Sequence, residues 1–196
     1  MQSNLDLNKE ISFKSFKEQV LNDYKLIVTS REASLLGRRE VLSGKAKFGI
    51  FGDGKELPQI ALAKVFQKGD FRSGYYRDQT FMMAINELTL KQLFSGLYAN
   101  TDINEEPMSA GRQMGAHFST VSLNEDGSWK DLINQRNSSS DVSCTGSQMP
   151  RLLGLAQASK LYRKLKTKNK NKLSVNGNEV AWGTIGNAST SEGVFF

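Results

Sequence analysis

The chain has 196 residues, of which 38% are apolar and 23% are charged. These proportions are typical of a globular chain with a buried core, and they exclude a fibrous or intrinsically disordered protein. The 26 basic and 20 acidic residues give a net charge of +6, which permits binding to nucleic acid or to phosphate groups without requiring either. A single cysteine, Cys144, excludes a disulfide framework and a cysteine-based metal site.

Three observations favour a cytoplasmic location. One cysteine suits a reducing compartment. No apolar segment approaches the length of a membrane span, and the polar start of the chain lacks the pattern of a secretion signal. We therefore expect a cytoplasmic protein.

The N-terminal region combines a polar arm with a long helix. Apolar residues recur at helical spacing from Phe13 onward, and the pattern continues to Gly44, a residue type that suits the left-handed end of a helix. Ser15 and Glu18 have the spacing of a capping box. We expect an N-terminal arm over residues 1–14.

The middle of the chain alternates helices and loops. Helices are predicted over residues 56–67 and 79–86, and another begins at Thr89, whose spacing from Gln92 matches a second capping box. Residues 68–78, between the first two of these helices, are rich in aromatic and arginine side chains and are expected to form a loop.

A long irregular segment follows over residues 100–127. Loops of this length inside a compact domain are usually functional or disordered. The run G-R-Q-M-G-A-H lies at its centre and ends at His117, the only histidine of the chain. By itself such a histidine is either a structural residue with satisfied hydrogen bonds or a catalytic group.

The next part of the chain predicts a buried helix and a basic linker. Ser147 opens a helix whose apolar residues, among them Leu152, Leu153 and Leu155, predict a buried element. Residues 160–172 contain seven lysines or arginines and no acidic residue. We interpret them as a solvated helix end and a linker, since Tyr162 alone could stack on a base.

The last stretch predicts a strand that runs into a tight loop. Residues 180–185 form a short apolar run of strand type, and the small polar residues 186–191 interrupt it. A hydroxyl residue of this loop would cap a following helix, with Glu192 in its first turn, so that backbone N–H groups face an anionic ligand. The candidate capping residues are Ser189, Thr190 and Ser191. Because the chain stops at Phe196, inside this expected helix, we expect a fragment of a longer protein.

These elements indicate α/β layers and one domain over residues 15–196. Four segments then stand out in order: Tyr75 to Asp78, the G-R-Q-M-G-A-H run, S-C-T-G-S-Q-M-P, and the terminal G-N-A-S-T-S-E-G. Together they resemble the alpha subunit of thiamine-diphosphate-dependent 2-oxoacid dehydrogenases, most closely the branched-chain type, from about Asp23 to Phe196. The resemblance implies a three-layer α/β thiamine-diphosphate-binding fold that is truncated within the cofactor signature.

The resemblance also implies the residues that bind the cofactor. Tyr76 and Arg77 match a pair that reaches the diphosphate of thiamine diphosphate. A guanidinium group can donate paired, charge-assisted hydrogen bonds to phosphate oxygens, and a phenol adds another donor. Ser143 and Thr145 match the family loop that supports the folded cofactor.

The terminal motif resembles the start of the family's thiamine-diphosphate signature and implies a magnesium site. It comprises Gly186, Asn187, Ala188 and Ser189. In the family a carboxylate at this place binds the Mg²⁺ ion that bridges the two phosphates. Here Asn187 takes that position, and its amide oxygen can ligate magnesium but supplies no negative charge.

Three further assignments follow from the same resemblance. Ser147 and Gln148 match positions that bind a structural K⁺ ion in some branched-chain members. His117 lies in a loop that faces the active-site entrance in relatives, which implies a catalytic role close to the substrate.

The implied reaction is the oxidative decarboxylation of a branched-chain 2-oxo acid, with transfer of the acyl group to lipoamide. The implied partners are a beta subunit or beta half and the lipoyl-bearing transacylase component, in an alpha2beta2 assembly or a fused homodimer. Neither nucleic acid nor a membrane is expected as a partner. The isolated fragment is expected to be inactive.

Two alternatives remain. The same chemistry could act on pyruvate or acetoin, although the G-R-Q-M run with its nearby histidine favours the branched-chain type. A basic nucleic-acid-binding domain belongs to a different class and requires basic residues interleaved with aromatic ones. The lysines of this chain cluster in one linker instead.

Overall fold

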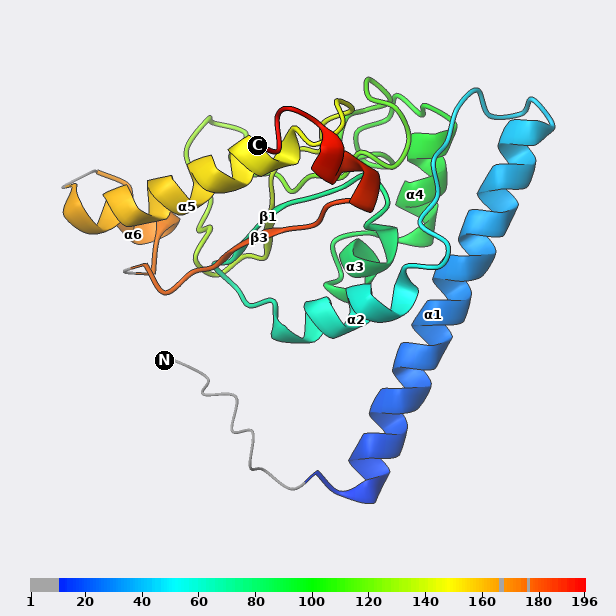
Figure 1. Ribbon diagram of the computed structural model, residues 1–196, viewed down its shortest axis with the longest axis horizontal. Coiled ribbons are helices and arrows are strands. Elements are labelled where there is room, and N and C mark those ends of the chain that lie inside the picture. Colours follow the sequence, from blue (N-terminus) through cyan, green and yellow to red (C-terminus); the bar gives the residue numbers. More distant parts are fainter. Residues whose placement is uncertain (1–10, 166–167, 176) are drawn as a thin grey trace.

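The computed structural model describes residues 11–165, 168–175 and 177–196 (Figure 1). Helices and short strands alternate along these residues, which confirms the predicted α/β class. In chain order the elements are α1 (Phe13–Leu42), α2 (Glu56–Val65), β1 (Phe71–Ser73), α3 (Gln79–Ala84), α4 (Leu90–Leu97), β2 (Asn137–Ser138), α5 (Gln148–Lys164), α6 (Lys170–Leu173), β3 (Ala181–Gly183) and the 3-10 helix η1 (Asn187–Ser191).

The strands form a parallel sheet in the order β2-β1-β3. Strand β1 lies in the centre, so the chain leaves it for β2 on one side and then crosses to β3 on the other. Phe71 pairs with both Asn137 of β2 and Ala181 of β3, so the three strands start at the same level. Their carboxyl ends therefore lie at one edge of the sheet, beside the point where the connections diverge, and α/β sheets bind ligands at such points.

Helices cover both faces of the sheet (Figure 1). On one face lies α5, and the hydroxyl of Ser73 in β1 donates a 2.8 Å hydrogen bond to the carbonyl oxygen of Gln148 at the start of this helix. On the other face the Trp182 ring of β3 lies 6.4 Å from the ring of Phe66, which follows α2. The sheet is thus the middle layer between α5 and the pair α2 and α3.

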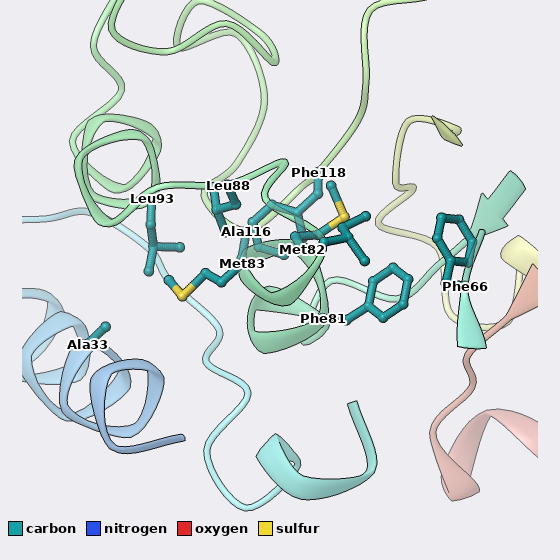
Figure 2. Close-up of a cluster of buried hydrophobic side chains, with 10 residues drawn as sticks. Ala33, Phe66, Phe81, Met82, Met83, Leu88, Leu93, Ala116 and Phe118 are labelled. Carbon is teal, nitrogen blue, oxygen red and sulfur yellow. The ribbon is translucent and has the colours of Figure 1, made fainter. Parts of the chain in front are cut away.

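The hydrophobic core surrounds α3 (Figure 2). Phe81 and Met82 are fully buried, and the Phe81 ring meets the Phe66 ring edge to face with centroids 5.1 Å apart. Ala116 and Phe118 of the long loop after α4 belong to the same cluster. The loop is therefore anchored in the core on both sides of His117.

Helix α1 packs on the core through small residues in its C-terminal half. Its buried residues are Ser30, Ala33, Ser34 and Gly37. Their small side chains let α3 approach closely, and the buried Gln79 amide donates to the Ser30 carbonyl at 3.0 Å and to the Ser34 hydroxyl at 2.8 Å. The N-terminal half of α1 extends away from the rest of the chain (Figure 1), with apolar side chains in solvent.

The start of α1 differs from the prediction, whereas its end agrees. Ser12 caps the helix and accepts a hydrogen bond from the Ser15 amide, so Ser15 lies inside the first turn and the proposed capping box at Ser15 and Glu18 is wrong. Ser12 precedes Ser15 by three residues, the same spacing that separates Ser15 from Glu18. It lies directly before Phe13, where the apolar pattern begins, which is the usual place of an N-cap residue. The helix ends at Leu42, and Gly44 has the expected positive φ of 77°. Most of the expected arm, residues 1–10, lies outside the described residues.

Two predictions in the middle of the chain have opposite outcomes. The capping box of Thr89 and Gln92 is confirmed at the start of α4. The segment 68–78 is not only a loop, because it contains β1, the central strand. Strands of two or three residues are too short to show an alternating pattern, so hydrophobic periodicity does not reveal β1 or β2.

Two C-terminal predictions are also wrong. Helix α5 is not buried: Gln148 is its one buried residue, and Leu153 is 73% exposed. Its apolar residues lie on two sides, and the sheet covers one of them. The predicted helix capped by Ser189, Thr190 or Ser191 does not form, because these residues belong to η1 and Glu192 after them is extended.

The basic run from 160 to 172 forms the exposed end of α5 and helix α6, except for residues 166–167, which lie outside the described residues. Across the described ranges, no helix combines the length and the hydrophobicity needed to cross a bilayer.

One buried arginine ties the strand ends together. Arg72 of β1 is 1% exposed and donates to both oxygens of Asp141, after β2, at 3.0 and 3.1 Å. It also donates to Asp78, after β1, at 2.8 and 3.0 Å and to the Ser138 hydroxyl at 2.7 Å. Asp78 in turn accepts a hydrogen bond from the Thr184 hydroxyl, after β3. The network therefore joins the segments that follow all three strands.

We expect Arg72→Met to lower the free energy of unfolding by about 3–5 kcal/mol, because it leaves two buried carboxylates without their cation. Urea denaturation followed by circular dichroism measures the change. Arg39→Met, at an exposed position of α1, is the matched control and should cost less than about 0.5 kcal/mol. Equal stability of the two variants would show that Arg72 does not hold the strand ends.

Candidate functional site

Three segments that follow the strands converge at the carboxyl edge of the sheet. Residues 74–78 follow β1, residues 139–146 follow β2, and residues 184–191 follow β3. They contain the Tyr75 to Asp78 segment and the first part of two others that stand out in the sequence, S-C-T-G-S-Q-M-P and G-N-A-S-T-S-E-G. The fourth, the G-R-Q-M-G-A-H run, joins them because its last residue is held next to the core. The fold therefore brings all four together.

Tyr75, Tyr76 and Arg77 form a group of two tilted aromatic rings and one guanidinium after β1. The two tyrosine rings have centroids 4.2 Å apart and their hydroxyl oxygens are 3.3 Å apart. The guanidinium carbon of Arg77 lies 5.6 Å from the Tyr75 centroid and 5.8 Å from the Tyr76 centroid. Burial, followed by the hydrogen bond with Tyr76, raises the pKa of Tyr75 to about 12. Tyr75 is therefore a neutral phenol at pH 7.

The backbone of Arg77 is fixed by the turn before α2. The Gln59 side chain donates a 2.9 Å hydrogen bond to the Arg77 carbonyl oxygen. An added Cβ atom at Gly52 would lie 2.3 Å from that same oxygen, so this close approach requires a glycine. The Nε atom of Arg77 is buried and has no hydrogen-bond partner within the described part of the chain. Buried donors are normally paired, so this cation is suited to an anionic ligand.

His117 contacts two other candidate residues. Its Nε2 atom lies 2.8 Å from the Ser143 hydroxyl, and its ring is stacked on Tyr76 with centroids 6.2 Å apart and planes 20° apart. Its Nδ1 atom lies 3.4 Å from the Gly115 carbonyl oxygen, which can only accept. The neutral ring that makes both contacts thus carries its proton on Nδ1 and accepts from Ser143. In this state Nε2 can receive a proton if Ser143 turns away.

Glu106 shapes the loop that leads to His117. Its buried carboxylate accepts hydrogen bonds from the backbone amides of Met108, Ser109 and Gly111 at 2.9–3.0 Å and from the Ser109 hydroxyl at 2.6 Å. Burial alone would raise the pKa of Glu106, but these hydrogen bonds outweigh it and lower the pKa below its ordinary value. The loop is thus folded around one ionised carboxylate.

The terminal motif lies beside the tyrosine pair. An added Cβ atom at Gly186 would lie 3.1 Å from the Tyr75 hydroxyl, so this glycine lets the two segments meet. Ser189 is buried, whereas Asn187 and Ala188 are exposed at the start of η1. The side chain of Asn187 is therefore accessible to a bound ion, and its main-chain oxygen accepts from Thr190 at 2.6 Å.

The other predicted residues lie close by but differ in their roles. Thr145 is exposed and Ser147 is half-buried at the cap of α5. Gln148 is buried, and its side chain donates to the Thr184 carbonyl at 3.0 Å, so it joins α5 to the segment after β3. No group of three or more histidine, cysteine or acidic side chains suited to a metal occurs in the described ranges.

Several residues that shape this edge are not identified by the sequence patterns described above. Arg72, Asp78 and Asp141 form the buried network, and Glu106 holds the loop before His117. The resemblance implies a role for Tyr76 but none for Tyr75. A neighbouring aromatic pair next to an arginine could have pointed to it, whereas a buried carboxylate such as Asp141 in a serine-rich segment resembles any surface residue.

No known protein family and no curated protein matches the sequence.

We expect Glu106→Gln to speed amide hydrogen exchange of Met108, Ser109 and Gly111 by about 5- to 30-fold at pH 7, because the lost charge weakens several hydrogen bonds, worth about 1–2 kcal/mol in total. Glu125→Gln, at an exposed loop position, is the control and should leave this exchange unchanged.

The same carboxylate predicts the pH dependence of the loop. Since its folded-state pKa is lowered, its contribution to stability is fully present above the unfolded pKa of about 4.3 and is lost as the pH falls through the lower folded-state pKa. The difference in the free energy of unfolding between Glu106→Gln and the unaltered protein, measured by urea denaturation at each pH, should therefore become smaller in acid. A difference that stays constant through this range would contradict the assignment.

Proposed function

We propose that this chain binds thiamine diphosphate and serves as the alpha part of a 2-oxoacid dehydrogenase that decarboxylates a branched-chain 2-oxo acid and transfers the acyl group to lipoamide. The observation that carries the proposal is the buried Nε of Arg77, which has no hydrogen-bond partner among the described residues. It lies beside Tyr76, at the edge where His117, Ser143 and Gly186 also lie. In this arrangement the Arg77 cation would bind a diphosphate, and the His117 imidazole would face a substrate.

The residues present fit the phosphate end of the cofactor. Arg77 and Tyr76 would donate to the diphosphate, and Gly186, which lets the terminal motif approach Tyr75, would bring Ala188 and Asn187 toward the same group. Ser143 and Thr145 would line the side formed by the segment after β2. Asn187 would contribute an amide oxygen to Mg²⁺, whose remaining ligands include phosphate oxygens and water. A K⁺ ion at Ser147 and Gln148 would need the Gln148 oxygen, since its nitrogen already donates to Thr184.

Thiamine diphosphate, when bound, supplies a nucleophilic carbon and an electron sink for the decarboxylation of a 2-oxo acid. The chain's own part is to hold the diphosphate, to exclude water and to present His117. With Nδ1 protonated, the Nε2 atom of His117 can accept a proton from a substrate or from Ser143. Its stacking on Tyr76 links its position to that of the phosphate-binding pair.

The proposed assembly pairs this chain with a beta subunit or a beta half, as alpha2beta2 or as a fused homodimer, and delivers the acyl group to a lipoyl-bearing transacylase. Exposed apolar side chains on α1 and α5 support an assembly, because such faces usually mark contact surfaces. Pyruvate or acetoin as the substrate stays the alternative. The test is lipoamide-dependent release of carbon dioxide from each of these substrates by the chain assembled with a beta subunit.

In that assembly we expect Arg77→Ala to raise the thiamine diphosphate concentration for half-maximal activity by about 30- to 150-fold. The loss of one charged partner of a phosphate costs about 2–3 kcal/mol, whereas the maximal rate should change little because the reacting end of the cofactor lies far from the diphosphate. Activity titrated with thiamine diphosphate separates the two parameters, and Arg39→Ala is the matched control. A large fall in maximal rate with an unchanged half-saturation would assign Arg77 to the wrong end.

We expect Asn187→Asp to lower the Mg²⁺ concentration for half-maximal activity by about tenfold, because it restores a ligand charge at the same side-chain length. The measurement is a magnesium titration at saturating thiamine diphosphate. Weaker magnesium binding would mean that another carboxylate already balances the charge and that the added one repels it. An unchanged titration would remove Asn187 from the metal site.

A further inference from the structure

A second pocket lies at the opposite end of the sheet from the candidate site. It has a volume of about 550 Å³, and its lining includes Lys68, three residues before β1, and Arg136, the residue before β2. The candidate site follows the carboxyl ends of the same strands. We name the second cavity the amino-end pocket. No residue of the proposed cofactor site lines it.

Backbone hydrogen bonds fix the segments that carry the basic residues. The amide of Gly69 donates to the Gln135 carbonyl at 2.8 Å, which joins the Lys68 and Arg136 segments. The amide of Leu132 donates to the Lys172 carbonyl at 2.9 Å, which joins the end of α6 to the loop before β2. The fully buried Asn137 side chain donates to the carbonyls of Leu132 and Gln135 at 2.8 and 3.0 Å. The pocket wall is therefore built into the fold.

The pocket is basic, and its cations are not neutralised by salt bridges among the described residues. Lys68, Lys130, Arg136 and Lys172 line it together with the carboxylates Glu87 and Asp131, and among the described residues none of the four cations forms a salt bridge within 4.0 Å. The Nε atom of Arg136 is buried without a hydrogen-bond partner in the described part of the chain. The pocket is shallow and open to solvent, and its excess of positive charge attracts anions.

Trp129 adds an aromatic wall to this basic pocket. It lines the cavity and is 38% exposed, and the Lys172 ammonium donates to its carbonyl oxygen at 3.0 Å, which holds the two residues together. The side-chain amides of Asn124, Asn134 and Gln135 line the same cavity. An indole beside cations and amides suits a planar heterocycle that carries phosphate groups, since the ring can stack and the amides can bind its polar edges.

We propose that the amino-end pocket binds a small anion of the nucleoside di- or triphosphate class, with its phosphates on Arg136, Lys68 and Lys130 and its base against Trp129. The site is distinct from the proposed cofactor site and does not depend on it. Because the pocket lies at the amino ends of the strands, a nucleotide bound there would not occupy the proposed cofactor site at the carboxyl edge.

Isothermal titration with ATP in the presence of EDTA tests this proposal. We expect saturable binding of one ATP per chain that weakens as salt is raised. Arg136→Gln and Lys68→Gln should each weaken it about tenfold, whereas Arg39→Gln, which removes the same charge from an exposed site on α1, should leave it unchanged. Lys68 is exposed, so its variant tests the site even if Arg136→Gln impairs folding. Thermal melting checks the fold of each variant.

Two further measurements separate the parts of the proposal. Trp129→Leu should weaken ATP binding but leave tripolyphosphate binding unchanged, and equal affinity of ATP and tripolyphosphate for the unaltered chain would overturn the nucleoside assignment. Absence of ATP binding would overturn the proposal that ATP binds in the amino-end pocket. Loss of ATP binding in Arg77→Ala but not in Arg136→Gln would overturn it as well. Binding of single-stranded RNA through Lys68 and Arg136 without binding of ATP would overturn it in favour of a nucleic-acid surface.

Discussion

The carboxyl edge of the sheet depends on the charge network around Arg72. The strands contain only two or three residues each, so few backbone hydrogen bonds connect them. The side chain of Arg72 adds hydrogen bonds to Asp141, Asp78 and Ser138, which connect the strand ends in addition to the backbone. One buried cation between two carboxylates is costly to desolvate, and burial raises the pKa of Asp141 although Arg72 opposes the shift. This desolvation cost occurs at the place where the network joins the three segments that follow the strands.

The candidate site stands on this network. Tyr75 donates its backbone amide to Asp78, and Phe118 donates its amide to Asp141, so the same carboxylates fix the tyrosine segment and the segment of His117. Arg77 differs from Arg72 in environment, although both belong to the same short stretch. Arg72 is saturated with partners, whereas Arg77 lies near two tyrosine rings and its Nε has no partner in the described ranges. This contrast separates a structural cation from one suited to a ligand.

The two ends of the sheet have different chemistry. The carboxyl end gathers phenols, an imidazole and hydroxyls, and the amino end gathers lysines and an arginine with an indole. At the amino end, Asp70 before β1 fixes β3 by accepting from the Val180 amide and the Trp182 indole, both at 2.8 Å. The surfaces of α1 and α5 remain partly apolar, and Leu153 is an exposed example. The net charge of +6 therefore does not show that the two ends of the sheet differ in the side chains they present.

The sequence by itself determined the α/β class, the length of α1, the start of α4 at Thr89 and the group of segments that the site contains. Helical periodicity and capping patterns are local, so neighbouring residues suffice to reveal them. Only the tertiary structure decided the strands β1 and β2, the exposure of α5, the 3-10 conformation at Asn187–Ser191 and the pairing of His117 with Ser143. These features depend on contacts between residues far apart in the chain, and such contacts leave no period in the sequence.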